Sequence, residues 1–103
     1  MDINLCELPD GWIKSFGFNL VRDIVDFYIS IPRERQKYFI ILQIKEKYGE
    51  LRIYHTCHLE DIDNFDWIIK KYEEIAKQTC IYCGRAIEMN QTVCDDCKRS
   101  QLI

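Results

Sequence analysis

Four cysteines near the end of the chain have the spacing of a metal site. Cys80, Cys83, Cys94 and Cys97 form the pattern C-x2-C-x10-C-x2-C. Two residues between paired cysteines allow both thiolates to bind one ion from a single tight turn, and two such pairs complete a tetrahedral shell. The pattern predicts one zinc ion held by four thiolates. Because no position is left open for a substrate, we expect this zinc to be structural.

Two other uses of these cysteines stay open, a pair of disulfides and a redox-active pair. Disulfides are typical of small secreted domains. The N-terminal residues, however, lack the basic segment and apolar run that mark a signal peptide, so a cytoplasmic location is expected. No apolar run approaches the roughly 20 residues that span a bilayer, and no membrane association is expected.

A second group of possible ligands and nucleophiles lies in the middle of the chain. His55, Cys57 and His58 could form another metal site or a Cys–His pair. In a strand, His55 and Cys57 would share a face about 7 Å apart, and no nearby acid would orient the imidazole. We therefore expect Cys57 to be a buried apolar residue and Cys6 an uninvolved thiol. Without a glycine-rich phosphate loop, a Ser–His–Asp order or an H-E-x-x-H motif, the chain is not expected to be an enzyme.

The charge distribution is uneven along the chain, although the net charge is only −3. Residues 33–58 carry six bases and three acids, whereas residues 1–32 and 59–79 each carry three more acids than bases. This is not the strongly basic surface of a protein that wraps duplex DNA, so any nucleic-acid contact should be weak.

Within the basic segment, Lys45, Lys47 and Arg52 are predicted to converge on a turn beside Tyr48. Such a cluster can contact a phosphate, a nucleotide or an acidic protein surface. The alternative is a solvated turn with ordinary cross-strand pairs. The acids at the start of the following helix leave two uses open as well, a partner contact or a favourable interaction with the helix dipole. The candidate partner-binding residues are Lys45, Lys47, Tyr48, Arg52, Asp61 and Asp63.

Two amphipathic helices and a hairpin account for residues 1–79. Residues 9–11, Pro-Asp-Gly, signal a turn or a helix entry, and a helix is predicted after them to about Ser30. Pro32 ends this helix, and a break at Gly17 would divide it into two shorter helices. Strands are expected over 38–45 and 51–57. A second helix follows, capped by Asp61, Asp63 or Asn64, and it runs almost directly into Cys80. Both helices should cover one side of the hairpin. The predicted core consists of Trp12, Phe16, Leu20, Ile40, Leu42, Ile53, Phe65, Ile69 and Tyr72.

The predicted class is therefore α+β, with helix, two-stranded antiparallel hairpin, helix, and a C-terminal zinc-knuckle or treble-clef-like module. Residues 1–79 would form the α-β-β-α core, and residues 80–103 the zinc-binding module packed on the second helix. In that module, Gly84 should take a positive φ after the first cysteine pair, and Cys94 should open a short helix.

The segment 43–54, Q-I-K-E-K-Y-G-E-L-R-I-Y, followed by a helix and paired cysteine motifs, resembles a group of small, uncharacterised bacteriophage and bacterial proteins. Those proteins carry an I-K-E-K-F-G-x-L-R-F-Y hairpin and a C-terminal C-x2-C-G and C-x2-C zinc motif. The Gly11-Trp12 pair fits the same group. This chain lacks the second glycine usual between the cysteine pairs, and Asn90 is expected to take its left-handed conformation. The resemblance implies a phage or mobile-element origin and a bacterial cytoplasm.

These features lead to two expectations for function. The first is a non-enzymatic zinc-binding protein that binds and modulates or inhibits a protein partner, as an antidefence-type factor does. The alternative is a nucleic-acid-binding zinc protein that regulates transcription through the basic hairpin and the zinc knuckles. A small nuclease or redox enzyme is a more distant third.

Overall fold

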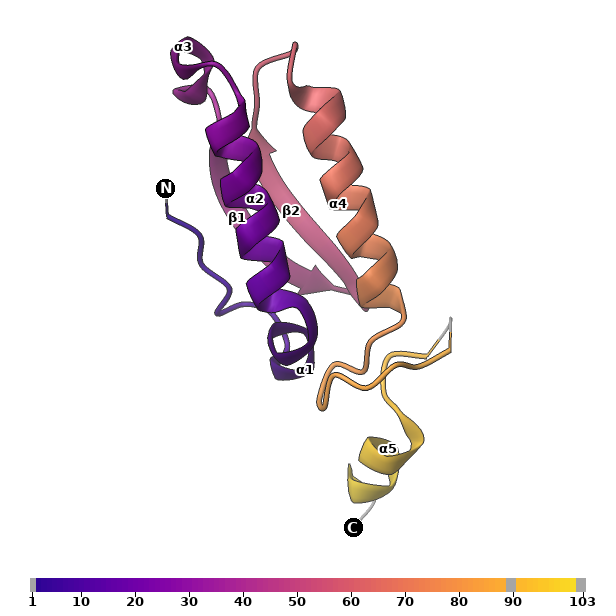
Figure 1. The fold of residues 1–103 in the computed structure, drawn as a ribbon. Helices are drawn as coiled ribbons and strands as arrows, with labels where there is room; N and C mark the ends of the chain where they lie inside the picture. The colour runs from indigo at the N-terminus through magenta and orange to yellow at the C-terminus, as the bar shows by residue number, and fades with distance from the viewer. Residues whose placement is uncertain (1, 89–90, 102–103) are drawn as a thin grey trace.

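Two helices lie on one side of an antiparallel hairpin, and a cysteine-rich segment extends beyond the end of the second helix (Figure 1). The structure is a computed structural model, and it describes residues 2–88 and 91–101. The predicted α+β order of helix, hairpin, helix and cysteine module is confirmed. The molecule is elongated, with principal extents of 55, 22 and 19 Å. No helix in the described part of the chain is long and apolar enough to cross a membrane.

The first helix is continuous from Asp10 to Ser30. It consists of α1 (Asp10–Trp12), a π-helical turn (Ile13–Gly17) and α2 (Phe18–Ser30). Gly17 keeps helical dihedral angles and does not split the helix in two. Ile31 turns to extended backbone before Pro32, as the sequence predicts. Six apolar residues that recur every three or four positions from this helix to its C-terminal end are all buried, namely Trp12, Phe16, Leu20, Ile24, Phe27 and Ile31.

The charged connector after Pro32 contains one short helix, α3 (Arg33–Gln36). The Gln36 side-chain amide donates to the carbonyl oxygens of Tyr28 and Ile31, at 3.2 and 3.3 Å. These bonds satisfy carbonyl groups that the end of α2 leaves without helical partners. The connector therefore closes the helix and turns the chain toward the hairpin.

Strand β1 (Ile40–Lys47) pairs with β2 (Glu50–Thr56) through a two-residue turn. Tyr48 and Gly49 both have positive φ, 56° and 80°, as a type I′ hairpin turn requires. The Glu46 carboxylate accepts a hydrogen bond of 2.7 Å from the Gly49 amide. The sequence placed this turn correctly, although β1 begins two residues later than expected.

The predicted core is wrong at Ile40 and Leu42, which are 52% and 62% exposed. The register shifts between Ile41 and Gln43, so a β-bulge interrupts the alternation of β1. A bulge reverses the direction of every side chain before it, which turns Ile40 and Leu42 away from the helices. Ile44 is buried beyond the bulge, and Ile53 packs against the core while staying partly exposed.

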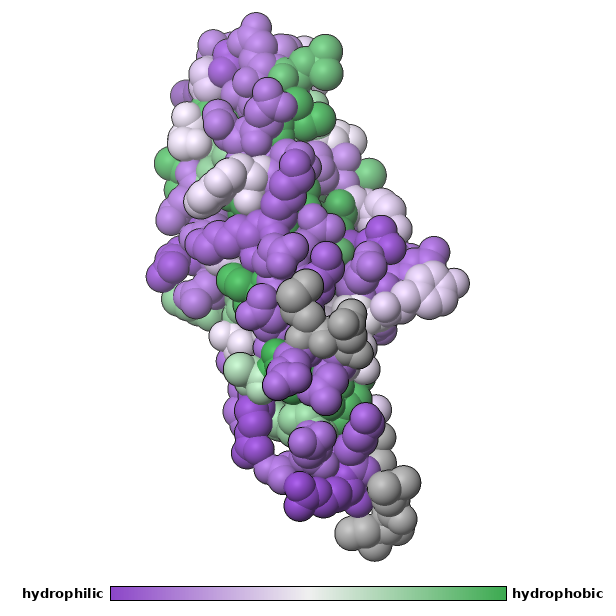
Figure 2. All heavy atoms as spheres, turned by 90° about the vertical axis from the view of Figure 1, so that its right-hand side faces the viewer, coloured by the Kyte–Doolittle hydropathy of each residue, from purple (hydrophilic) through white to green (hydrophobic). Residues whose placement is uncertain are grey.

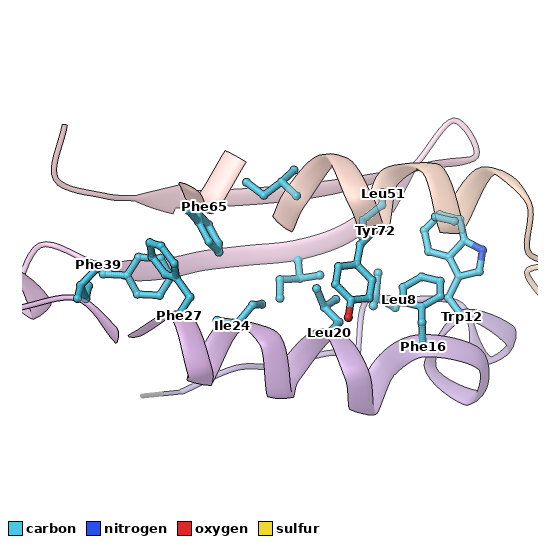
Figure 3. Packing of buried hydrophobic residues seen from close by; sticks show 14 residues of the cluster. Leu8, Trp12, Phe16, Leu20, Ile24, Phe27, Phe39, Leu51, Phe65 and Tyr72 are labelled. Atoms are coloured by element: carbon cyan, nitrogen blue, oxygen red, sulfur yellow. The ribbon is translucent and has the colours of Figure 1, made fainter. Parts of the chain in front are cut away.

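Helix α4 (Ile62–Lys77) buries Phe65, Ile69, Tyr72 and Ala76, which include the three residues of this helix in the predicted core. Ile62 is 37% exposed. Figure 3 shows the buried side chains filling the space between α2, α4 and the hairpin. Phe27, Phe39 and Phe65 meet at one end, where the Phe39 and Phe65 ring centroids are 4.8 Å apart. Trp12, Phe16 and Tyr72 meet at the other end, next to the cysteine-rich segment.

Candidate metal centre

The four cysteines of the C-terminal motif converge on one point. The sulfur atoms of Cys80, Cys83, Cys94 and Cys97 all lie within 4.8 Å of one another, and the Cys83 and Cys94 Sγ atoms are 3.6 Å apart. Four thiolates at 2.3 Å from a tetrahedral ion would be separated by about 3.8 Å. The donor set therefore fits a metal ion bound by four sulfur atoms.

The same geometry does not fit disulfide bonding. All six cysteines of the chain are free in the structure. The separation of 3.6 Å between the Cys83 and Cys94 sulfur atoms is far above the roughly 2.05 Å of a disulfide bond. Four sulfur atoms gathered around one centre instead fit the ligand shell of a single metal ion.

The first cysteine pair sits in a tight turn. The Gly84 amide donates to the Cys80 carbonyl oxygen at 3.1 Å, and Gly84 has φ +82°, the positive value that the sequence predicted. On either side of this turn the chain doubles back, because the Cys80 amide bonds to the Arg85 carbonyl oxygen and Thr79 bridges Ala86. The turn thus presents both thiols from one side, as a zinc knuckle does.

The second cysteine pair opens helix α5 (Asp95–Gln101), which confirms the predicted short helix. The Lys98 amide donates to the Cys94 carbonyl oxygen at 3.0 Å and closes the first helical turn. An ion pair between Arg85 and Asp96 connects the two cysteine turns. It raises the pKa of Arg85 and lowers the pKa of Asp96, because the hydrogen bond between them favours both charged forms. Asn90, expected in the left-handed conformation, lies outside the described residues.

Backbone amides around the centre stabilise negative charge on sulfur. Burial opposes ionisation of Cys80, yet hydrogen bonds from the amides of Cys83, Cys94 and Tyr82 lower its pKa to about 6. A hydrogen bond with Cys94, burial and the neighbouring sulfur atoms raise the pKa of Cys97 to about 12. Four thiolates this close repel one another, so all four cysteines ionise together only when a cation offsets their negative charge.

The residues around the centre cannot form a hydrophobic core. Among the described residues after Cys80, only Cys94 is buried. Helix α5 has seven residues and no apolar face, and a helix this short is marginal in water. A metal ion bound by the four thiolates would supply free energy that orders this segment.

The centre is docked on the start of the first helix through two glycines. The Gly11 amide donates to the Ile81 carbonyl oxygen at 2.9 Å, and a Cβ on Gly11 would lie 2.2 Å from the Cys80 carbonyl oxygen. A Cβ on Gly84 would meet the Gly11 carbonyl oxygen at 2.7 Å. The buried indole of Trp12 donates from Nε1 to the Thr79 carbonyl oxygen at 3.1 Å. Sequence reasoning missed this junction, although the Gly11-Trp12 pair was visible as a motif.

The structure brings four of the candidate partner-binding residues together on the hairpin. Lys45 and Arg52 are directly opposite each other across the strands, and Lys47 and Tyr48 lie at the turn. The Tyr48 side chain is 87% exposed, with Lys47 Nζ 5.7 Å from its ring centroid. Arg52 pairs with Glu50 at 2.9 Å, which is an ordinary contact between neighbours on one strand face.

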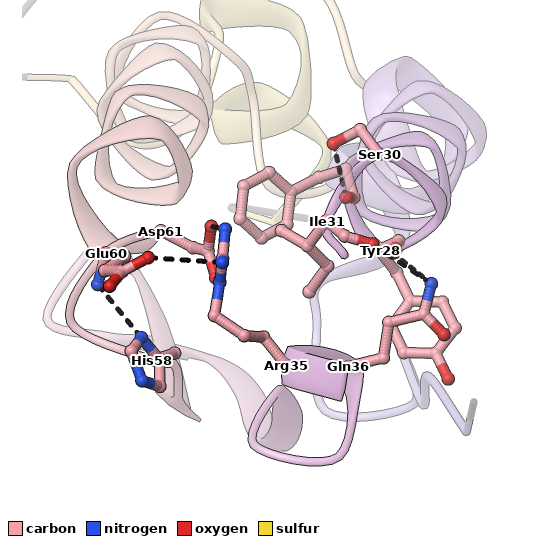
Figure 4. A network of polar contacts seen from close by, with 9 residues as sticks. Tyr28, Ser30, Ile31, Arg35, Gln36, His58, Glu60 and Asp61 are labelled. Atoms are coloured by element: carbon pink, nitrogen blue, oxygen red, sulfur yellow. Dashed lines mark hydrogen bonds and ion pairs between the residues drawn. The ribbon is translucent and has the colours of Figure 1, made fainter. Parts of the chain in front are cut away.

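The two acidic candidates lie at the opposite end of the hairpin, where the chain enters α4 (Figure 1). Asp61 is only 5% exposed, and its two carboxylate oxygens accept hydrogen bonds of 2.9 and 3.0 Å from Arg35 (Figure 4). This hydrogen-bonded pair lowers the pKa of Asp61. Glu60 also contacts Arg35, at 3.1 Å. Asp61 therefore holds the connector to α4, while Asp63 is exposed in the first turn.

The histidines and the isolated cysteines take separate positions. The His55 ring packs edge-on against Phe65, with centroids 4.6 Å apart, whereas His58 accepts a hydrogen bond from the Glu60 amide at Nδ1. Cys57 packs against the core, and burial raises its pKa. Cys6 is exposed. Within residues 2–88 and 91–101, the four C-terminal cysteines are the only group of three or more metal-ligating side chains that converge.

Comparisons with protein-family models, with curated proteins and with solved structures find no match to this chain. The resemblance to phage and bacterial hairpin proteins thus stays a prediction based on the motifs. The function is inferred from the geometry of the metal centre and of the surfaces around it.

Proposed function

We propose that the chain is a small zinc-binding protein in which the ion orders the C-terminal segment and holds it against the core. The observation that carries this proposal is the convergence of four sulfur atoms within 4.8 Å. A tetrahedral set of four thiolates is typical of zinc and of iron–sulfur centres, and the two knuckle-like turns favour zinc. With four protein ligands no coordination position is left for a substrate, so the ion acts in folding.

Metal analysis tests this first step. The purified protein should contain about one equivalent of zinc, and cobalt substitution should give the visible absorption of a tetrahedral sulfur site. Cys80→Ser should lose the metal and lower the melting temperature, since an incomplete shell cannot order the segment. Cys57→Ser is the matched control, because it removes a thiol outside the centre. Full metal retention in Cys80→Ser, or iron in place of zinc, would refute the assignment.

We further propose that the protein acts without catalysis, by binding a protein partner and modulating or inhibiting it. The motif resemblance suggests a phage or mobile-element protein whose partner belongs to the host or to a competing phage. The exposed Tyr48 at the turn and the nearby Arg52 support this idea, because Tyr and Arg are the residue types that most often dominate interfaces. The Asp61–Arg35 pair and the bond from Tyr72 to Asp23 hold the fold together and need no catalytic role.

Binding of nucleic acid is the second candidate, and one observation favours it. Three lysines of the hairpin region lie next to tyrosine rings, a combination that single-stranded nucleic-acid sites use. The pairs are Lys37 with Tyr38, Lys45 with Tyr54, and Lys47 with Tyr48. The net charge of −3 argues for the protein partner, since it weakens attraction to a polyanion.

An affinity pull-down from nuclease-treated bacterial lysate separates the two candidates. A protein partner should be captured by the wild type and lost with the double variant Tyr48→Ala and Arg52→Ala, while metal content and folding stay intact. Submicromolar binding to DNA at physiological salt, lost when Lys45 and Lys47 are removed, would replace the protein-partner proposal with the nucleic-acid one. Capture unchanged by the double variant would place the contact elsewhere on the molecule.

A further inference from the structure

Among the residues that the structure describes, no helix or strand covers the outer face of the hairpin. Helices α2 and α4 both lie on the opposite side of β1 and β2 (Figure 1). Strand alternation and the register place one set of side chains on the uncovered side. We call this set the outer face, and it includes Ile40, Leu42, Gln43, Lys45, Arg52 and Tyr54, with Tyr38 just before β1.

Ile40, Leu42 and Tyr54 form the apolar centre of this face. Two polar residues flank it, because Thr56 lies opposite Ile40, and Gln43 lies opposite Tyr54 and donates to the Glu7 carboxylate at 2.8 Å. Ile40, Leu42 and Tyr54 are 52%, 62% and 42% exposed, and Tyr38 is 47% exposed at one end. A solvated face of an antiparallel sheet normally carries polar residues. The bulge in β1 is what turns Ile40 and Leu42 outward, and contiguous exposed apolar side chains mark interaction sites. The side formed by α4 and the cysteine-rich segment is, by contrast, largely hydrophilic (Figure 2).

The end of the outer face nearest the turn is basic. Lys45 and Arg52 are directly opposite each other, and Lys45 Nζ lies 5.4 Å from the Tyr54 ring centroid. Lys47 adds a third base, whereas Glu50 is the one acid of the two strands on this side and is bonded to Arg52. The Nε donor of Arg52 has no hydrogen-bond partner among the described residues. A basic end therefore adjoins an apolar centre on one surface of an otherwise acidic protein.

We propose that the outer face binds an acidic, amphipathic protein segment. Apolar side chains of the segment would cover Ile40, Leu42 and Tyr54, and its carboxylates would pair with Lys45 and Arg52. This inference rests on the proposed protein-binding function and names the chemistry of the partner.

Charge and shape argue against the other occupants of this face. Tyr38 and Tyr54 offer rings on which a base can stack, but Ile40 and Leu42 on the same face are aliphatic, and the net charge of −3 weakens attraction to a polyanion. Two copies of the chain joined through this face would bring like positive charges into one interface. An acidic protein segment instead complements both the apolar centre and the basic end.

Peptide display against the immobilised, zinc-loaded protein tests the proposal. Peptides selected by the wild type should combine Asp and Glu with aliphatic or aromatic residues. Their affinity should fall at least about tenfold with Ile40→Thr plus Leu42→Thr, and also with Lys45→Glu plus Arg52→Glu. Selection against the charge-reversed variant should enrich Lys and Arg in place of the acids. Threonine keeps the β-propensity of the strand, so the first variant should fold normally.

Matched control variants lie on α4. Trp67 is 68% exposed and the Lys70 side chain 74% exposed, so Trp67→Gln and Lys70→Glu remove comparable groups from another surface. These variants should leave the affinity of the selected peptides unchanged within about twofold. Peptides that respond to the α4 variants instead would overturn the inference while keeping the protein-binding function.

Three other outcomes would also overturn the inference. Selected peptides without an acidic excess would refute the proposed chemistry. A shift to dimers that the Ile40 and Leu42 substitutions abolish, measured by sedimentation, would assign the face to a second copy. Tighter binding of single-stranded oligothymidylate than of any selected peptide, or selection of no peptide above background, would reject the protein-binding function as well.

Discussion

Replacing Gly11 with alanine tests whether the metal centre is mechanically joined to the core. The new Cβ would lie 2.2 Å from the Cys80 carbonyl oxygen and 2.7 Å from the Gly84 amide nitrogen, both of them backbone atoms. Because no side-chain rotation can relieve such contacts, the cysteine-rich segment must move away from α1. Gly11→Ala should therefore open the junction without touching a metal ligand.

The magnitude follows from the hydrogen bonds that the junction contains. Loss of the bond between the Gly11 amide and the Ile81 carbonyl oxygen costs about 0.5–1.5 kcal/mol. The buried Trp12 Nε1 loses its acceptor on Thr79, and an unsatisfied buried donor costs about 1–3 kcal/mol. Together these terms predict that Gly11→Ala lowers the free energy of unfolding of the zinc-loaded protein by roughly 2–4 kcal/mol.

The assay is urea denaturation followed by far-UV circular dichroism, with and without bound zinc. Zinc content should stay at one equivalent, because all four ligands lie within residues 80–97. In zinc-free protein the destabilisation should shrink below about 1 kcal/mol, since the segment that meets Gly11 is then unordered.

Gly17→Ala provides the control within the same helix. Its Cβ would face the ends of the Leu5 and Ile13 side chains at 3.3 and 3.4 Å, which can adjust. Alanine also favours a helix over glycine by up to about 1 kcal/mol, so this variant should be nearly neutral or slightly stabilising. Equal effects of the two alanines, or an effect of Gly11→Ala that does not depend on zinc, would refute the proposed junction.

Three further predictions concern the core, the turn and the pH dependence. Ile69→Ala truncates a buried side chain and should lower the free energy of unfolding, measured by urea denaturation, by about 2–5 kcal/mol. A decrease below about 1 kcal/mol would contradict the packing of α4. Gly49→Ala should lower the free energy of unfolding by roughly 1–2 kcal/mol, because the φ of +80° at this position is strained for alanine. The new Cβ would also lie 2.8 Å from the Thr92 methyl group, a contact that Thr92→Ser removes. If the serine restored full stability, the backbone strain would be disproved. The hydrogen bonds from Arg35 lower the pKa of Asp61 in the folded state below its unfolded value of about 4. The ionised carboxylate therefore stabilises the fold above about pH 4, and this contribution is lost as the pH falls through the lower folded pKa. Stability measured at stepwise lower pH should thus fall less steeply in Asp61→Asn than in wild type, and parallel curves would contradict the role of the pair.

The sequence by itself determined those features whose physical cause is local. The two-residue spacing in each cysteine pair sets the turn that presents both thiols, so the ligands of the metal centre were predictable without knowledge of the fold. The helical period of the apolar residues likewise identified both long helices and their buried sides. The turn at Tyr48 and Gly49 was placed correctly because a two-residue hairpin turn with positive φ favours glycine.

Only the tertiary structure decided features that depend on contacts between residues distant in the sequence. The bulge after Ile41 turned Ile40 and Leu42 outward, and no local pattern marks where two strands lose register. Asp61 lies at a helix start, where a partner contact or an interaction with the helix dipole was expected, yet its carboxylate is bonded to the Arg35 side chain from α3. The approach of Gly11 to Cys80 is set by how the first helix and the end of α4 pack together. Such contacts depend on how all helices and strands pack together, so no short segment of the sequence predicts them.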